Sequence, residues 1–188
     1  MTLGFAITGS FCTIASAIGQ MKILIDKGYE ILPIMSEIVY KTDTKFAKAK
    51  DLTEIVEKLT DNKIIHSIKD AEPIGPENFL DALVIAPCTG NTLSKIANGI
   101  NDTSVTMAAK AHVRNNKPII FSIATNDALS ANAKNLGVLL NSKNVYFVPF
   151  VQDDYTKKPN SIVADITRLP ETVEEAVNGR QIEPILWR

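Results

Sequence analysis

Residues 86–100 read Ala86-Pro87-Cys88-Thr89-Gly90-Asn91-Thr92-Leu93-Ser94-Lys95-Ile96-Ala97-Asn98-Gly99-Ile100, a polar, kinked turn between an apolar strand and a helix. The residues before it predict a buried strand, and Pro87 lacks the N–H that a continuing strand ladder needs. The turn then places hydroxyls, an amide and bare backbone N–H groups at a helix start. Such groups hold an anion or a flat polar heterocycle. The alternative is an ordinary turn with a Thr or Asn cap.

A second strand-to-helix turn lies near the N-terminus. Residues 3–8 predict a short buried strand, Gly9-Ser10 a tight turn, and residues 13–27 a helix with apolar positions at helical spacing. The N–H groups and the positive dipole end of such a helix form a phosphate site. The turn has one glycine where the dinucleotide fingerprint has three, and no Gly-Lys-Ser/Thr follows it, so it is neither that fingerprint nor a P-loop.

Two further strands end in small polar residues, at Ser36 and at Ala124-Thr125-Asn126-Asp127. In open α/β sheets, ligands bind outside the carboxyl ends of the strands. The four polar strand ends therefore predict one crevice. Apolar strands alternate with helices along the chain, which predicts a three-layer, doubly wound parallel sheet with right-handed crossovers. The expected elements are strands at 3–8, 30–35, 64–67, 82–86, 118–123 and 145–148, and helices at 13–27, 52–60, 92–97, 104–115, 128–140 and 171–178.

Composition limits the function classes. With 188 residues, 45% hydrophobic residues and a formal charge of −1, we expect a single domain, 1–188, whose polar, turn-rich residues 150–188 form a C-terminal extension or tail. The charge gives no electrostatic basis for binding nucleic acid or anionic membranes. The first basic residue, Lys22, follows the apolar N-terminal run, so we expect no signal peptide and no membrane span.

Cysteine and histidine are sparse. Cys12 and Cys88 have no metal-ligand spacing and predict no metal site; both are expected near the crevice rim, as small wall residues more than as nucleophiles. His66 lies in a segment whose structure the pattern leaves open. His112 lies on the helix expected at 104–115, where a surface or interface position is the default.

These motifs resemble the flavoprotein family of homo-oligomeric flavin-containing cysteine decarboxylases and flavin prenyltransferases. Residues 6–10 and 28–36 look like the start of that family, and Pro87-Cys88-Thr89-Gly90-Asn91-Thr92 stands in the place of its Pro-Ala-Ser-Ala-Asn-Thr signature. Ala124-Thr125-Asn126 matches its Ala-Met-Asn-like loop. The resemblance covers roughly residues 3–150. It implies a Rossmann-like flavoprotein fold and bound flavin mononucleotide (FMN).

The resemblance also implies which residues form the site. The flavin phosphate is expected at Gly9, Ser10 and Ser36 with Thr89 and Thr92 close by, and Asn91 and Asn126 are expected to line the isoalloxazine or substrate end. Helix capping is the alternative role of both asparagines. Asn160 and Ser161 are weaker candidates near the substrate, and no catalytic residue is assigned. The full set of expected cofactor-binding residues is Gly9, Ser10, Phe11, Ser36, Thr89, Asn91, Thr92, Ala124, Thr125 and Asn126.

Within the family, the whole chain most closely resembles one subunit of a two-subunit oxidoreductase from the cytoplasm of sporulating bacteria. That resemblance implies a small dicarboxylate substrate and a partner subunit that supplies NAD(P). A flavin-dependent decarboxylase and a non-catalytic subunit that binds flavin or phosphate are the alternatives. The loop at 124–126 lacks the methionines of the decarboxylases, which weakens the first alternative.

The resemblance further implies a homo-oligomer, a trimer or a multiple of it. The helix expected at 104–115 carries apolar residues around much of its girth, more than one core face requires, and we expect it to pack against a neighbouring protomer.

Overall fold

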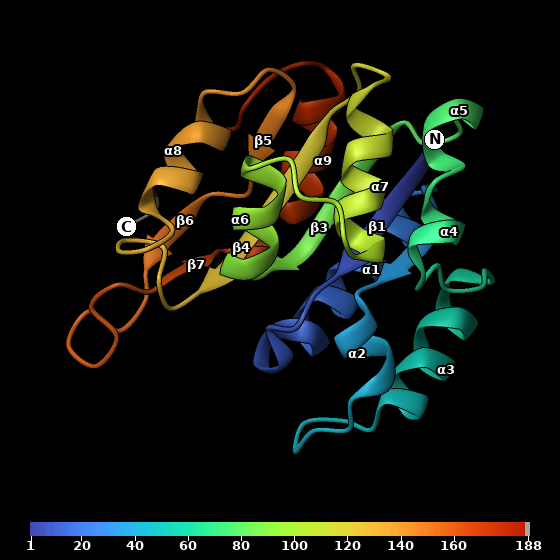
Figure 1. The fold of residues 1–188 in the computed structure, drawn as a ribbon, viewed down its shortest axis with the longest axis horizontal. Helices are drawn as coiled ribbons and strands as arrows, with labels where there is room; N and C mark the ends of the chain where they lie inside the picture. Colours follow the sequence, from blue (N-terminus) through green and yellow to red (C-terminus); the bar gives the residue numbers. More distant parts are fainter. Residues whose placement is uncertain (187–188) are drawn as a thin grey trace.

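The computed structural model describes residues 1–186, which form a seven-stranded sheet flanked by helices (Figure 1). The strand order is β2-β1-β3-β4-β7-β6, and β5 pairs with the first half of β4. Strands β1 to β5 run parallel, whereas β7 pairs antiparallel with β4 and with β6. The strands are β1 (Thr2–Ile7), β2 (Glu30–Met35), β3 (Ala82–Cys88), β4 (Ile119–Thr125), β5 (Val145–Phe147), β6 (Phe150–Gln152) and β7 (Ile162–Ala164).

Helices cover both faces of the sheet, which confirms the three-layer, doubly wound arrangement. On one side α4, α5 and α6 pack against α7, and α8 packs against α6, while α1 and α9 pack together on the other side (Figure 1). The α-helices are α1 (Ile14–Asp26), α2 (Glu37–Lys41), α3 (Ala49–Thr60), α4 (Ile68–Ala71), α5 (Ile74–Glu77), α6 (Gly90–Ala97), α7 (Ser104–Val113), α8 (Ala133–Leu140) and α9 (Leu169–Val177). The 3-10 turns are η1 (Phe11–Thr13) and η2 (Ile166–Arg168).

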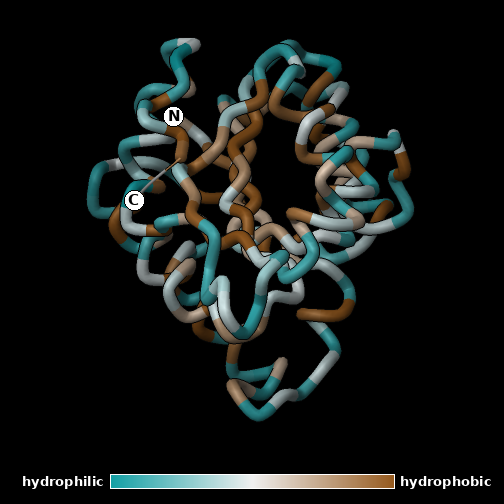
Figure 2. Tube along the Cα trace, turned by 90° about the vertical axis from the view of Figure 1, so that its left-hand side faces the viewer, coloured by the Kyte–Doolittle hydropathy of each residue, from teal (hydrophilic) through white to brown (hydrophobic). Residues whose placement is uncertain are grey.

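The core follows from the hydrophobicity of the central strands. Every residue of β3 is buried, as expected for a parallel strand covered on both faces. Figure 2 shows the strands as a mainly brown, hydrophobic band inside a surface of mixed and hydrophilic segments. Pro87 lies within β3, where the register with β4 shifts between Ile85 and Cys88. The strand therefore extends past Pro87, although the regular pairing is interrupted there.

The helix α7 is covered in large part by its own chain. It packs against α4, α5 and α6 and against β2 and β3, and Val113 at its end remains 53% exposed. Its expected contact with a neighbouring protomer stays a prediction. His112 on this helix is fully buried, and its Nε2 atom lies 3.1 Å from the Pro118 carbonyl oxygen. The expected surface or interface position of His112 is wrong, because three short helices between residues 68 and 97 cover this face.

Other differences concern short elements. The strand expected at 64–67 is reduced to a single bridge between Ile34 and Ile65. The structure adds α2, α4 and α5, which have five or fewer residues each. Beyond residue 149, β6 and β7 extend the sheet and α9 packs against β3, β4 and β5.

Candidate functional site

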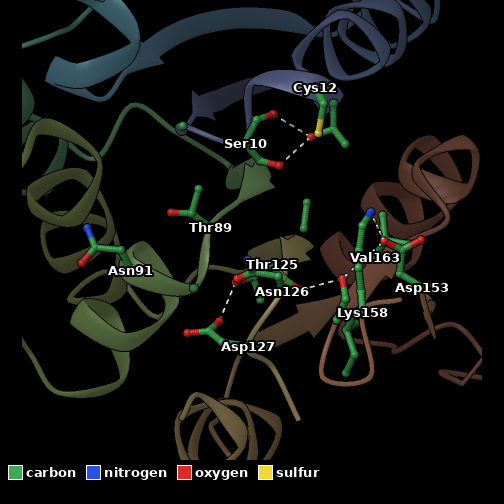
Figure 3. Close-up of a pocket in the computed structure, with 16 residues that line it drawn as sticks. Ser10, Cys12, Thr89, Asn91, Thr125, Asn126, Asp127, Asp153, Lys158 and Val163 are labelled. Carbon is green, nitrogen blue, oxygen red and sulfur yellow. Dashed lines mark hydrogen bonds and ion pairs between the residues drawn. The ribbon is translucent and has the colours of Figure 1, made fainter. Parts of the chain in front are cut away.

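A cleft of about 580 Å³ lies at the carboxyl ends of β1, β3 and β4 (Figure 3). This volume falls within the range of small-molecule and cofactor sites. The turn after β1, the start of α6, the end of β4 and residues of the segment 153–163 form its walls. The predicted residues that line the cleft are Gly9, Ser10, Thr89, Asn91, Ala124, Thr125 and Asn126.

Three predicted residues do not line the cleft. Phe11 lines a separate apolar groove beside α1 and α3. Thr92 is buried in the first turn of α6, where its hydroxyl accepts a hydrogen bond from the Thr89 hydroxyl (3.1 Å). Ser36 is buried beside the end of β1, where its N–H donates to the Ile7 carbonyl (3.0 Å). Its hydroxyl has no hydrogen-bond partner among the described residues.

The start of α6 is fixed by Thr89 and Thr8. The Thr89 side chain caps the helix by accepting from the Thr92 N–H (3.3 Å). The Thr8 hydroxyl donates to the Pro87 carbonyl (2.7 Å) and accepts from the Thr89 N–H (3.0 Å). These bonds hold the ends of β1 and β3 together and orient the helix start toward the cleft. Asn91, in the first turn of α6, is exposed. It is not the cap of the helix, because Thr89 holds that position.

The turn after β1 presents the start of a long helix. The Thr13 hydroxyl donates to the Ser10 carbonyl (2.9 Å) and lies 3.1 Å from the Ser10 hydroxyl. Neither η1 nor α1 has a side-chain cap. A helix start without a cap leaves N–H groups and a partial positive charge available to an anion.

The wall formed by the end of β4 contains a partly buried polar network. Asp127 accepts from the Thr125 hydroxyl (2.6 Å) and from the Asn132 amide (2.7 Å). The side-chain Oδ1 atom of Asn132 in turn accepts from the Asn135 amide (2.8 Å), and the Oδ1 atom of Asn135 accepts from the Asn98 amide (3.0 Å). Asn98 is the C-cap residue of α6, so the network connects α6 with α8 and with the loop after β4. Asn132, not Asn126, is the N-cap residue of α8.

The opposite wall contains Asp153 and Lys158, which sequence reasoning missed, and Ser161, a weaker candidate; Asn160 does not line the cleft. Lys158 Nζ and Asp153 Oδ2 lie 2.9 Å apart, and the Ser161 hydroxyl donates to the Thr125 carbonyl (3.2 Å) (Figure 3). The hydrogen bond from Lys158 lowers the pKa of Asp153, and the same bond raises the pKa of Lys158. Both groups are therefore charged near neutral pH. The polar composition of residues 152–161 was the available signal, but it did not indicate which residues face the cleft.

The two cysteines lie in different environments. Cys12 is exposed and lines the cleft, as expected. Cys88 is fully buried in β3 and does not line it. Burial raises the pKa of the Cys88 thiol, which makes it a poor nucleophile. The expectation that Cys88 forms a wall of the crevice is wrong, because its side chain is part of the core.

Residues 1–186 contain neither a candidate metal cluster nor a membrane-spanning helix. No cluster of three or more His, Cys, Asp or Glu side chains in this range could hold a metal ion. No helix in the same range is long and apolar enough to cross a membrane.

Comparisons with known proteins show which chains this one is similar to. The B subunit of dipicolinate synthase from Bacillus subtilis (strain 168) is 46% identical over 184 residues, 98% of this chain and 92% of the relative. The crystal structure of the dipicolinate synthase B subunit from Bacillus halodurans C matches with a TM-score of 0.91 at 44% identity, and covers 100% of this chain and 96% of that one.

More distant structures share the fold alone. Burkholderia xenovorans DmrB in complex with FMN, described as a cubic protein cage for redox transfer, matches with a TM-score of 0.68 at 17% identity. The match covers 94% of this chain and 95% of that one.

A family model described as Flavoprotein matches residues 1–176. The chain therefore belongs to the flavoprotein family.

Proposed function

We propose that this chain serves as the B subunit of a dipicolinate synthase and acts with the A subunit of that enzyme to oxidise dihydrodipicolinate to dipicolinate. The 46% identity to the Bacillus subtilis relative over 98% of this chain carries the proposal. In this role the chain works in the cytoplasm of a sporulating cell. Oxidation of the dihydro ring removes one hydride and one proton, so the reaction needs a two-electron acceptor.

We further propose FMN as the cofactor of this chain. The start of α1 after Gly9 and Ser10 has no side-chain cap, and the buried Ser36 hydroxyl beside β1 has no partner among the described residues. Unused donors of this kind fit a phosphate ester. Thr89 and Asn91 then lie along the cleft toward the ring of the flavin, together with Thr125 and Asn126. Bound flavin supplies two-electron redox chemistry to the site.

The nicotinamide cofactor, NAD(P), is proposed to come from the A subunit. The turn Gly9-Ser10 has a single glycine, so the chain carries no dinucleotide fingerprint there. A cleft open at the carboxyl ends of β1, β3 and β4 can accept a ligand presented by a partner. The residues of this chain would hold the dicarboxylate and orient its ring between the walls of the cleft.

The proposal is tested by reconstitution with the A subunit encoded by the same organism. Dipicolinate formation from dihydrodipicolinate is measured with each of the two chains separately and with both together, in the presence of FMN and NAD(P). We expect product only with both chains. Formation at an undiminished rate when the A subunit is the only chain present would overturn the proposal. A flavin-free variant such as Ser10→Asp separates the catalytic role from a purely structural one, because a structural partner would still restore activity.

We also propose that the chain forms a homo-oligomer, a trimer or a multiple of it. Support comes from DmrB, a protein of the same fold that is described as a cubic protein cage. Closed symmetric assemblies are the usual form of homo-oligomers. Light scattering at micromolar concentration is expected to give a mass at least three times that of the chain, and a monomeric mass would overturn the proposal.

A further inference from the structure

The cleft is poor in positive charge for a site that takes anions. Three of its lining residues are charged, namely Asp127, Asp153 and Lys158. Lys158 is the only basic side chain among the described residues that line the cleft. A dicarboxylate ligand brings two negative charges, and like charges in a partly enclosed site repel strongly. Recognition of such a ligand therefore depends on where its carboxylates lie relative to Lys158.

The lysine is held in place by its backbone. Its N–H donates to the Asp154 carbonyl (2.6 Å), and its own carbonyl accepts from the Ser161 N–H (3.0 Å). Ser161 in turn bonds to Thr125 at the end of β4. Figure 1 shows this orange segment as a loop that projects beyond β6 and β7. The loop thus fixes the start of the Lys158 side chain against the sheet.

The charged end of Lys158 is able to change partners. The Lys158 and Asp153 side chains are 56% and 34% exposed. An ion pair as exposed as this one contributes little stability, so a ligand carboxylate can replace one partner at small cost. Asp153 would then accept from the Ser161 hydroxyl, which lies 3.4 Å from Asp153 Oδ2 and would turn to it from the Thr125 carbonyl.

Asp127, the other acidic residue of the cleft, also directs an anionic ligand toward Lys158. Both oxygens of Asp127 already accept hydrogen bonds, from Thr125 and from Asn132. Asp127 therefore has little need of a cation, and its negative charge repels a carboxylate. Figure 3 shows Lys158 and Asp153 on the wall opposite Thr89 and Asn91.

We propose that Lys158 forms a carboxylate-binding subsite of the cleft, where it exchanges Asp153 for one carboxylate of an aromatic dicarboxylate. This inference rests on the proposed function for the identity of the ligand. It makes Lys158 a specificity-determining residue, because a neutral molecule of the same shape would gain nothing from the exchange.

The exchange predicts opposite effects for the two members of the pair. Lys158→Gln removes the cation and should weaken binding of pyridine-2,6-dicarboxylate to the FMN-loaded full chain by about tenfold or more. Asp153→Asn releases the lysine from its competitor and should tighten binding several-fold. If the pair only held the loop in place, both substitutions would break it and both would weaken binding.

A matched control is the adjacent Lys157. Its side chain is 83% exposed, lies 3.8 Å from Asp154 and does not line the cleft. Lys157→Gln makes the same change in net charge and should leave the dissociation constant within about twofold. The neutral diamide of the same pyridine should bind equally to the parent and to Lys158→Gln.

Isothermal titration of the dicarboxylate, the diamide and FMN against each variant distinguishes the outcomes. Weaker binding in both Lys158→Gln and Asp153→Asn, or no change in either, overturns the assignment of Lys158 while leaving the proposed function intact. An equal loss of FMN affinity in Lys158→Gln assigns the lysine to the flavin phosphate and overturns it too. A parent chain that binds FMN but no dicarboxylate contradicts the proposed function itself.

Discussion

The backbone of Gly90 lies so close to Asp127 that a β-carbon added at residue 90 would be 2.5 Å from the Asp127 Oδ1 atom. It would also approach Thr125 Oγ1 (2.6 Å) and Asn132 Nδ2 (2.7 Å). The missing side chain therefore makes room for the polar network that joins α6 to the loop after β4. We expect Gly90→Ala to destabilise the protein by about 1–3 kcal/mol, the usual cost of overpacking. Chemical denaturation measures this change.

Gly137 is the matched control for this substitution. It lies on the exposed face of α8, and a β-carbon there would meet no atom within 4 Å. Gly137→Ala should therefore stabilise the protein by about 1 kcal/mol through helix propensity alone. Equal effects of the two substitutions would contradict the steric account of Gly90.

Ser10→Asp tests the proposed phosphate position. A carboxylate about 4 Å from a phosphate costs about 4 kcal/mol at an effective dielectric near 20, enough to lower FMN affinity by more than about a hundredfold. Flavin fluorescence titration gives the affinity. The control is Ser142→Asp. In the parent, the Ser142 hydroxyl donates to the Val138 carbonyl at the exposed end of α8. Unchanged FMN binding in Ser10→Asp would show that the phosphate lies elsewhere.

Substitutions of Asn91 and Thr89 should separate ligand binding from helix capping. Asn91 is exposed in the cleft and does not cap α6, so Asn91→Ala should leave stability within about 0.5 kcal/mol and weaken ligand binding about threefold to tenfold. Thr89→Ala removes the cap and should cost about 1 kcal/mol of stability. Denaturation and titration of both variants check this division. Parent-like binding by Asn91→Ala would exclude a role in the site.

The burial of His112 predicts that the stability of the folded protein falls at acidic pH. Burial lowers the pKa of this imidazole from 6.5 to about 4, so the folded protein holds the neutral form. The contribution of neutral His112 to stability is fully present above 6.5, the pKa in the unfolded chain. It is lost as the pH falls from there toward about 4, the pKa in the folded protein. The parent should lose about 2 kcal/mol of stability from this group between about pH 7 and about pH 5.

The variant His112→Gln isolates that contribution. Glutamine retains an amide that can donate to the Pro118 carbonyl, and it does not titrate. The difference in unfolding free energy between parent and variant should therefore shrink as the solution is acidified. A difference that stays constant over this range would mean that His112 titrates alike in the folded and the unfolded protein, and would contradict the lowered pKa.

The sequence predicted the parallel strands well because their signal is local. Continuous apolar runs such as Leu83 to Ala86 indicate a strand covered on both faces, and the polar residues after them mark the cleft. Thr89, Asn91 and Ser10 could be placed on this basis, since the carboxyl ends of parallel strands meet at one edge. The short β6 and β7 left too little periodicity to detect.

Other parts depend on distant contacts that a local pattern does not contain. The apolar girth of α7 gave no sign that the short helices α4 and α5 of the same chain pack against it. Lys158 resembles its neighbour Lys157 in the sequence, and only the pairing of β7 with β4 brings it to the cleft. The antiparallel extension of the sheet could not be derived from residues 162–164 alone.

The division of β4 between two partners has a consequence for the order of folding. Its first half pairs with β5, whereas Ala124 and Thr125 pair with Val163 and Ile162 of β7. A folding chain can thus assemble strands β1 to β5 before β7 pairs with β4. The wall that carries Lys158 is added last, so the parallel sheet takes its shape before the cleft is complete.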